Sequence, residues 1–397
     1  MRKNKMRIGI VISHPIQHFC PQYVSFAQNK SIELKVFFAS ALGRRKFIDV
    51  DFNEEISWGN LNLDSFQHVF LNGDVLIQPD KHIDAPSLDQ NLNDYQPDII
   101  FIYGYFQKLQ RRAKRWALKH GVKIAYISDS EMRHPESLAK KYLKSIFLRY
   151  YFSKINYFLT VGNANEAYYK HNGVPQSRMI RMHYPIDILE YINSYNQKEF
   201  LNKSIREQYN IDFNETVLTV VGKLVRWKNQ DHIIEAMKLL ETEGIYVTLF
   251  ILGSGEMKET WEYRAKELKR SKVYFPGFIK IEELPSYYAA TDIYVHPASL
   301  EPHSVAISEA VMMGCPVILS NYCGSYGNTD DVQQEKNGYV FEFGNTWSLA
   351  QKIKYLCENE QIRKEFAKYS HNNAIQFQQK SHYGVIQELL ERFKSGT

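Results

Sequence analysis

The sequence predicts an α/β protein with two domains, each built on a mainly parallel sheet. Short apolar runs that suit buried strands alternate with helix-like stretches along the whole chain, which is typical of parallel sheets flanked by helices. A length of 397 residues is enough for two domains with sizeable cores. The segment from His183 to Asp187, which contains Pro185, separates two series of strands and is the best candidate for the link between the domains.

Eleven runs predict strands. In the first half they are residues 8–12, 33–38, 99–103, 123–127 and 157–161. In the second half they are residues 217–221, 247–252, 273–275, 293–295, 317–319 and 339–341. Residues 53–97 are the least regular part and predict loops and short strands. Residues 376–393 predict a helix, because Val385, Leu389, Leu390 and Phe393 fall on one face.

Composition and charge exclude several classes of protein. The chain is 44% hydrophobic and 23% charged, as is ordinary for a soluble globular protein. The net charge of +5 is mild, and the sequence has no zinc finger, RNA-binding aromatic pattern or Arg-rich tail, so we expect no nucleic acid partner. The four cysteines lack CxxC spacing, which argues against a zinc site or a disulfide framework. With no visible signal peptide and no apolar run near the roughly 20 residues that span a bilayer, we expect a cytoplasmic protein.

Two glutamates, Glu301 and Glu309, bracket a predicted strand-to-helix turn. Ser304 can cap the helix that follows, and Gly314 can end it. In such units the loop and the helix N-terminus lie at the carboxyl edge of the sheet, where free N–H groups attract phosphate. Because carboxylates repel a phosphate, we expect the glutamates to accept hydrogen bonds from hydroxyls instead. One pair of these hydroxyls would belong to a hexose and one pair to a ribose. The unit predicts a sugar-nucleotide site.

Further motifs follow three other predicted strands. Gly222 lets a ligand approach the backbone, and Lys223 and Lys228 place two cations that suit a diphosphate at the end of one strand. A solvated basic loop is the plainer interpretation, which the position in the same domain as Glu301 disfavours.

Gly253 and Gly255 form a short turn after the next strand, without the full fingerprint of a dinucleotide site. Phe278 and Ile279 follow a third strand. A flat base could pack against them, and core packing explains them equally well.

These segments together resemble family 4 of the retaining glycosyltransferases, which have the GT-B fold of two Rossmann-like domains facing across a cleft. The resemblance is almost continuous from residue 217 to about residue 345. It implies that Glu301 holds hexose hydroxyls, that Glu309 holds the ribose, and that Lys223 and Lys228 bind the donor diphosphate. It also implies donor contacts from the backbone amides of His303, Ser304 and Val305. The usual Glu-Gly-Phe-Gly run is replaced here by Glu301-Pro302-His303-Ser304, which puts the identity of the sugar in doubt.

The resemblance implies a retaining enzyme that moves a sugar from a nucleoside diphosphate to a hydroxyl of a glycan or lipid-linked acceptor, in surface polysaccharide or glycoconjugate synthesis. Lys223, Lys228 and Glu301 are the expected catalytic residues. No DxD-like carboxylate pair accompanies the phosphate site, so we expect no metal, and we expect no cofactor beyond the donor. Residues 1–185 would form the acceptor domain and residues 186–375 the donor domain. The terminal segment, residues 376–397, would cross back to the first domain.

Two loops of the first half are candidates for acceptor binding. His14 and His18 follow the opening strand, where packing at a helix start explains either one about as well. Asp129 and Glu131 follow the strand at residues 123–127. Many relatives carry a His-Asp pair there, whereas this chain has Ser128-Asp129, so the role of that histidine cannot be transferred.

Basic and aromatic residues interleave over residues 108–119 and 140–154. The apolar stripe of the second segment fits either a core face or a helix lying on an anionic membrane. A lipid-linked acceptor would favour the second interpretation and the inner face of the cell membrane.

Two other functions stay open. A GT-B sugar-nucleotide epimerase would convert the donor without an acceptor. A non-catalytic GT-B subunit would bind a nucleotide sugar, a glycan or a partner enzyme without turnover, although both glutamates and both lysines count against it.

Overall fold

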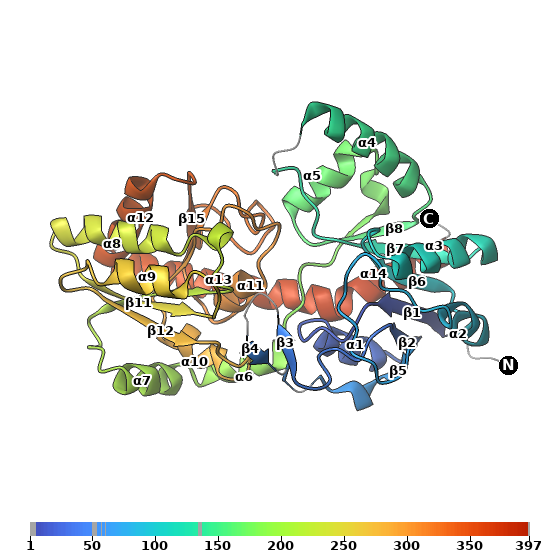
Figure 1. Ribbon diagram of the computed structural model, residues 1–397, viewed down its shortest axis with the longest axis horizontal. Coiled ribbons are helices and arrows are strands. Elements are labelled where there is room, and N and C mark those ends of the chain that lie inside the picture. The colour runs from blue at the N-terminus through green and yellow to red at the C-terminus, as the bar shows by residue number, and fades with distance from the viewer. Residues whose placement is uncertain (1–4, 50–53, 57, 60, 134–136, 396–397) are drawn as a thin grey trace.

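A computed structural model of the chain describes residues 5–49, 54–56, 58–59, 61–133 and 137–395. Two lobes lie side by side, each organised around one sheet, and the last long helical segment of the chain runs from one lobe to the other (Figure 1). Each sheet separates two clusters of buried apolar side chains, because successive residues of a strand point to opposite faces. The predicted α/β class and the two-sheet architecture are confirmed.

The first sheet contains seven parallel strands within the described residues. They are β1 (Met6–Ile12), β2 (Ile32–Phe38), β5 (Gln67–Phe70), β6 (Ile99–Tyr103), β7 (Lys123–Ile127), β8 (Tyr157–Thr160) and β9 (Met179–Arg181). Their order is β5-β2-β1-β6-β7-β8-β9, so the strand order reverses beside β1. An antiparallel pair, β3 (Phe47–Asp49) and β4 (Glu54–Ile56), lies outside this sheet.

The second sheet contains six parallel strands in the described part of the chain. They are β10 (Thr216–Val221), β11 (Val247–Leu252), β12 (Lys272–Gly277), β13 (Ile293–His296), β14 (Val317–Ser320) and β15 (Gly338–Phe341). Their order is β12-β11-β10-β13-β14-β15. The predicted boundary at residue 185 falls between β9 and β10.

Helices connect the strands of both sheets. Those of the first half are α1 (Cys20–Ala27), α2 (Leu88–Tyr95), α3 (Lys108–His120), α4 (Leu138–Ser153) and α5 (Asn163–His171), with short 3-10 turns η1 (Leu63–Ser65) and η2 (Gln176–Arg178). Those of the second half are α6 (Ile188–Asn196), α7 (Lys198–Gln208), α8 (Asp231–Thr242), α9 (Lys258–Ala265), α10 (Leu284–Ala290), α11 (Val305–Met312) and α12 (Thr346–Glu358), with the 3-10 turn η3 (Arg226–Lys228). Helix α2 was not predicted; it buries Leu88, Leu92 and Tyr95 in an otherwise polar segment.

The C-terminal helix joins the two lobes. It consists of α13 (Glu360–Gln379), a π-helical turn η4 (Lys380–Gly384) and α14 (Val385–Ser395). Val385, Ile386 and Leu389 of α14 pack into the core of the first lobe. This crossing, which the resemblance implied, is observed, and the helix begins earlier than residue 376.

The π-helical turn is anchored on both sides of the link between the lobes. Ser25 Oγ and His382 Nδ1 are 2.8 Å apart, and His382 Nε2 lies 2.8 Å from the carbonyl oxygen of Ile186. Gln378 donates to the carbonyl of Tyr184 at 2.8 Å. The helix therefore holds the connecting segment against the first lobe at the point where the chain passes into the second.

Helix α4 does not use its predicted apolar stripe as a core face. Its buried face consists of Leu148, Tyr151 and Phe152, at i, i+3 and i+4 spacing. The large residues of the stripe that remain between 49% and 71% exposed are Tyr142, Leu143, Ile146, Phe147 and Tyr150. Core packing is therefore the wrong explanation for these five side chains.

Candidate active site

The candidate site lies where the strand order of the second sheet reverses. Strand β10 is hydrogen-bonded to both β11 and β13, so the chain leaves β10 and β13 in opposite directions. A crevice forms at such a point, at the carboxyl ends of the strands. The loop after β10 carries Gly222, Lys223 and Lys228, and the loop after β13 carries Glu301.

A cavity of about 200 Å³ opens at this crevice and has walls from both lobes. Its lining residues are Gln17, His18, Val221, Gly222, Leu252, Gly253, Phe278, Ile279, Ile281, Leu284, Val305, Ala306 and Glu309. Donor candidates predicted on four separate segments therefore face one space, together with the acceptor candidate His18. Phe278 also packs against a small cluster around Leu42 and Phe47 of the first lobe.

Glycines bring the ends of β10 and β11 into contact. Gly253 has φ +142°, and a Cβ atom there would lie 2.0 Å from the carbonyl oxygen of Gly222. Gly255 has φ +151°, and its Cβ would lie 2.5 Å from the carbonyl oxygen of Leu224. Neither position tolerates a side chain, because the obstacle is backbone. Gly255 does not line the cavity but shapes the loop behind it.

Lys228, Glu301 and His296 form one hydrogen-bonded cluster. The Lys228 ammonium donates to Glu301 Oε2, and His296 Nε2 lies 3.2 Å from the same oxygen. Burial opposes ionisation of Glu301, but the hydrogen bond from His296 and the positive charge of Lys228 outweigh it and hold its pKa at about 2. Glu301 is therefore a carboxylate at neutral pH. The lysine ammonium has three N–H donors, so it can bridge this carboxylate and a phosphate.

Contacts between the two loops place Lys228 beside Glu301. The Trp227 carbonyl accepts a hydrogen bond from the Ser299 backbone at 2.9 Å, and the Asn229 side chain donates to Ser299 Oγ at 3.0 Å. Asn229 has φ +51°, which suits asparagine and turns the chain after Lys228. Lys223 precedes this turn with a half-buried side chain, and its carbonyl accepts from Gln230 at 3.2 Å.

Glu309 lies in α11 with its carboxyl group buried at the cavity wall. Burial raises the pKa of Glu309 to about 7, against the effect of hydrogen bonding from tyrosine. The Tyr288 hydroxyl donates to Glu309 Oε2 at 2.9 Å. A carboxyl group in this environment changes its charge near neutral pH, unlike Glu301.

His303 and Ser304 make their hydrogen bonds with other buried residues and do not line the cavity. His303 Nε2 lies 3.2 Å from Asp331 Oδ2, and its ring stacks on Tyr184 with centroids 5.0 Å apart. Burial opposes protonation of His303, but the hydrogen bond and charge of Asp331 outweigh it and raise its pKa. The Ser304 backbone N–H donates to Ser325 Oγ at 2.9 Å. Ser304 is the residue at the N-cap of α11, but its side chain makes no capping hydrogen bond.

The two histidines predicted to bind the acceptor differ in position. His18 lines the cavity, and its Nε2 is a buried nitrogen with no hydrogen-bond partner in the described structure. Burial, and then the proximity of His14, lower the pKa of His18 to about 3. His14 is held away from the cavity, with Nδ1 2.8 Å from Ser13 Oγ and its ring stacked on Trp58. His18 is therefore neutral and open to a hydroxyl partner.

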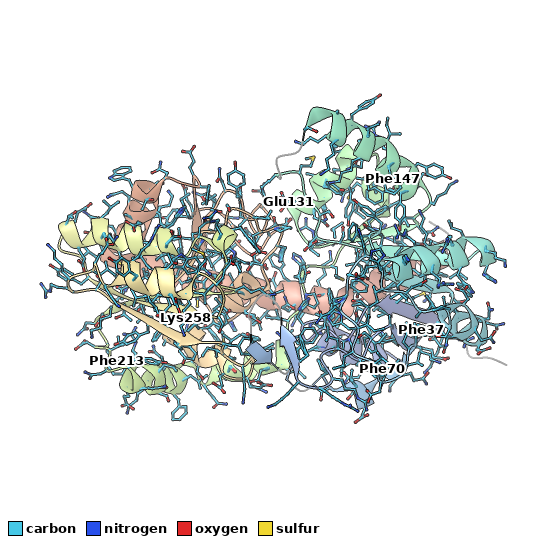
Figure 2. All side chains as sticks on the ribbon, in the orientation of Figure 1. Phe37, Phe70, Glu131, Phe147, Phe213 and Lys258 are labelled. Atoms are coloured by element: carbon cyan, nitrogen blue, oxygen red, sulfur yellow. The ribbon has the colours of Figure 1, made fainter. Side chains whose placement is uncertain are left out.

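The carboxylates after β7 lie outside the cavity wall. Burial, and then the charge of Asp129, raise the pKa of Tyr184, so Asp129 lies near the stacked rings of Tyr184 and His303. Glu131 Oε2 lies 3.4 Å from Arg133 Nη1, which also donates to the carbonyl of Cys323 in the second lobe at 3.1 Å. Figure 2 shows Glu131 in the part of the first lobe that faces the second. Glu131 thus supports a contact between the lobes.

Sequence reasoning missed three residues of the site. Gln17 lines the cavity beside His18, and its place in the loop after the first strand was the available signal. His296 is the last residue of β13 and contacts Glu301. Tyr288 lies in α10, and only tertiary packing brings its hydroxyl to Glu309.

Residues 202–373 match the family model described as Glycosyl transferases group 1. A glycosyltransferase of Methanocaldococcus jannaschii, described as uncharacterized, is 29% identical over 219 residues, which are 50% of this chain and 54% of the relative. The capsular polysaccharide biosynthesis glycosyltransferase CapM of Staphylococcus aureus is 26% identical over 198 residues, which are 48% of this chain and 49% of that relative. The chain spans about half the length of these curated relatives.

Among solved structures, Anabaena HepE in complex with UDP-glucose has a TM-score of 0.66 at 17% identity. The likeness covers 98% of this chain and 100% of HepE. It extends beyond the matched domain to both lobes and the crossing helix, and it shows the GT-B fold.

Proposed function

The chain belongs to the glycosyl transferases group 1 family, and from this we propose that it transfers a sugar from a nucleoside diphosphate to a hydroxyl of a glycan or lipid-linked acceptor. The observation that carries the proposal is a cavity whose walls come from both lobes. Gly222, Gly253 and Glu309 line it from the second lobe, and Gln17 and His18 line it from the first. A donor and an acceptor can thus meet there. UDP-glucose is the first donor to test, because a protein of the same fold binds it.

In the proposed reaction, an acceptor oxygen bonds to the anomeric carbon while the bond from that carbon to the diphosphate oxygen breaks. Attack on the face from which the diphosphate leaves retains the configuration, and the acceptor proton passes to an oxygen of the leaving diphosphate. Lys228, with Lys223 beside it, would stabilise the charge that develops on this group. Glu301 and Glu309 would accept hydrogen bonds from donor hydroxyls, and neutral His18 would bind the acceptor hydroxyl.

A panel of sugar nucleotides tests the proposal. The protein is screened for thermal stabilisation by UDP- and GDP-sugars, and release of nucleoside diphosphate is then measured with and without glycan and lipid-linked acceptors. We expect stabilisation by one donor, release that depends on acceptor, and weaker donor binding in Glu309→Ala. An epimerised donor formed without acceptor would identify an epimerase. Stabilisation without turnover on any acceptor would instead favour a binding subunit.

The two ionisation states of Glu309 predict a pH dependence of donor binding. With a pKa of about 7 in the donor-free protein, Glu309 is mostly protonated at pH 6 and mostly ionised at pH 8. Only the carboxylate can accept hydrogen bonds with both oxygens, so affinity for UDP-glucose should rise between these values.

Calorimetric titration at pH 6, 7 and 8 measures this change, and Glu309→Gln, which cannot ionise, should bind with an affinity that is flat across the range. The raised pKa also means that unfolded Glu309 ionises before the folded group does. Its contribution therefore lowers stability as pH rises from about 4.5 to about 7. An affinity that falls with pH in the unmodified protein would contradict the assigned role.

We also propose that the enzyme works on an anionic membrane surface through α4. No helix in the described ranges is both long and apolar enough to cross a membrane, so contact would be peripheral. Five large apolar side chains of α4 are exposed, and Lys140, Lys141, Lys144 and Arg149 accompany them on the same helix. Apolar insertion together with attraction to anionic lipid is the usual basis of such binding. Work at this surface fits a role in surface polysaccharide synthesis with a lipid-linked acceptor.

Removing the apolar part of this surface should weaken membrane binding. Leu143→Glu with Phe147→Glu places two carboxylates where we expect lipid, and we expect at least tenfold less protein to float with vesicles containing phosphatidylglycerol. The matched control is Leu189→Glu with Phe200→Glu, which changes two side chains of the second lobe that are 67% and 69% exposed. The membrane proposal would be contradicted if both variants floated equally well with the vesicles. Flotation that does not depend on anionic lipid would also contradict it.

A further inference from the structure

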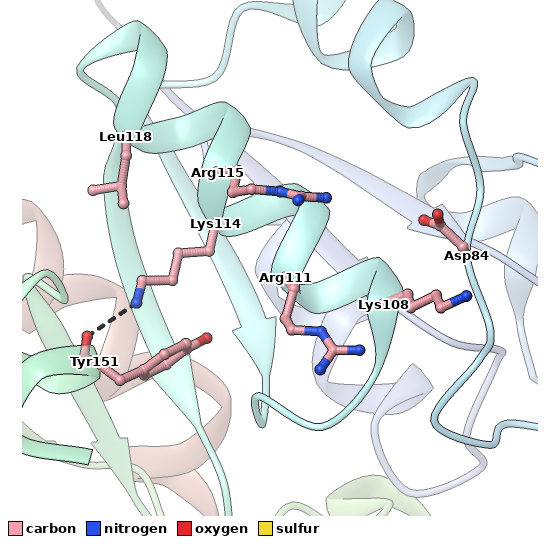
Figure 3. Close-up of a pocket in the computed structure, with 7 residues that line it drawn as sticks. All are labelled: Asp84, Lys108, Arg111, Lys114, Arg115, Leu118 and Tyr151. Atoms are coloured by element: carbon pink, nitrogen blue, oxygen red, sulfur yellow. Dashed lines mark hydrogen bonds between the residues drawn. The ribbon is translucent and has the colours of Figure 1, made fainter. Parts of the chain in front are cut away.

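A second cavity, of about 520 Å³, opens between α3 and α4 of the first lobe. Its lining residues are Asp84, Lys108, Arg111, Lys114, Arg115, Leu118 and Tyr151 (Figure 3). None of these seven residues lines the cavity of the candidate active site. Four of them are cations and one is a carboxylate, so the cavity has a strong positive bias.

The carboxylate does not neutralise the cavity, because it is already paired. Asp84 accepts hydrogen bonds from Arg112 Nε at 2.8 Å and from Arg112 Nη2 at 2.9 Å. The hydrogen bond from Arg112 lowers the pKa of Asp84, so it is ionised and its charge is matched by that arginine. Within the described chain, Lys108, Arg111 and Arg115 form no ion pair.

Lys114 adds a buried cation to the cavity wall. Its side chain is almost fully buried, its ammonium donates to the Tyr151 carbonyl at 3.1 Å, and it lies 3.2 Å from the centroid of the Tyr151 ring. Burial lowers the pKa of Lys114 to about 8. It is therefore still mostly charged at pH 7. Its partners, a carbonyl and a ring face, carry no formal charge.

The first turn of α3 carries cations, which the helix dipole disfavours at that end. Lys108 and Arg111 lie in the first turn, which contains no acidic residue. Cations at a helix N-terminus are destabilising, since that end carries a partial positive charge. An anion in the cavity would offset this repulsion and would match the unpaired side chains.

We propose that this cavity binds a phosphate group. The guanidinium groups of Arg111 and Arg115 offer paired N–H donors that match phosphate oxygens, and Lys108 and Lys114 add point charges. The group can come from an anionic phospholipid or from a soluble phosphate ester. Tyr151 in the cavity wall contacts Phe147 of the exposed α4 face, with ring centroids 5.8 Å apart. A phospholipid head group could thus occupy the cavity while its chains lie toward α4.

Calorimetric titration with short-chain phosphatidic acid, inorganic phosphate and short-chain phosphatidylcholine tests the assignment. All variants are made in a Lys223→Gln/Lys228→Gln background, so that phosphate bound at the candidate active site does not contribute. We expect this background protein to bind phosphatidic acid, and Arg111→Gln with Arg115→Gln to weaken that binding at least tenfold. Both arginines are exposed, so the variant should fold. Lys266→Gln with Lys269→Gln removes the same charge from the second lobe and should bind normally.

The probes separate the two sources of phosphate. Phosphatidic acid that binds at least tenfold more tightly than inorganic phosphate indicates a lipid head group, and equal affinities indicate a soluble phosphate. The proposal would be overturned if neither phosphatidic acid nor inorganic phosphate bound. It would also be overturned if the arginine substitutions left binding unchanged, or if phosphatidylcholine bound as tightly as phosphatidic acid. Because no assay step requires sugar transfer, this outcome is independent of whether the proposed enzyme activity is correct.

Discussion

Lys228→Ala is expected to lower turnover by roughly 100-fold or more, which is the scale of losing one preorganised charge donor. The ammonium group contacts Glu301 in a partly buried cluster with His296. Its removal takes away a charge that would stabilise the leaving diphosphate and leaves Glu301 with His296 as its remaining partner in the cluster. The charge on the leaving group develops in the transition state, so kcat should fall more than the affinity for the donor.

Steady-state kinetics with saturating donor and acceptor measure this effect. Arg226→Ala is the matched control, because Arg226 lies in the same 3-10 turn with an exposed side chain. The double variant Lys228→Ala/Glu301→Gln should lose less than the product of the two single losses, since the two groups contact each other. Near-normal turnover in Lys228→Ala would remove this lysine from the catalytic machinery.

Gly253→Ala is expected to disrupt both the fold of the second lobe and donor binding. The new methyl group would lie 2.0 Å from the carbonyl oxygen of Gly222, and φ at this position is +142°. Because the obstacle is backbone, no change of rotamer relieves it, and the ends of β10 and β11 must separate. Such strained conformations alone cost about 1–3 kcal/mol. We expect donor affinity to fall at least tenfold.

Gly244→Ala provides the comparison. Gly244 also has positive φ, at +77°, but a Cβ there meets no atom within 4 Å. Its substitution should cost only about 1–2 kcal/mol, which is the strain of the left-handed conformation without a clash. Urea unfolding followed by tryptophan fluorescence includes a signal from the second lobe through the buried Trp261, beside that of Trp116 in the first lobe. Equal losses in the two glycine variants would show that the close approach of β10 and β11 is unimportant.

Direct contacts between the two lobes limit how the cleft between them can open. Arg181 of the first lobe donates to Asp330 of the second at 3.0 Å, and Asp330 also accepts from the Asn163 backbone at 2.9 Å. Together with Arg133 and the stacking of Tyr184 on His303, these contacts hold the loop around residues 323–331 against the first lobe. Any opening of the cleft must break them or move that loop.

Local sequence patterns were enough to predict the two parallel sheets and much of the candidate donor site. Buried parallel strands are continuous apolar runs, so residues 99–103 and 247–252 were predicted with the bounds that β6 and β11 have in the structure. Carboxyl ends of such strands converge on one edge, so Gly222, Gly253 and Glu309 could be assigned to a common site before any contact was known. Helix α2 was not predicted, because its three buried residues lie in an otherwise polar segment.

Tertiary structure alone decided which side chains meet and which faces stay exposed. Lys228 and Glu301 are 73 residues apart, and their contact depends on the two loops packing together. His18 joins the donor cavity only because the lobes face each other, and α4 exposes its apolar stripe because Leu148, Tyr151 and Phe152 supply its core face instead. Periodicity reveals that a side chain is apolar or charged, but its partner comes from a distant segment, and only packing selects that segment.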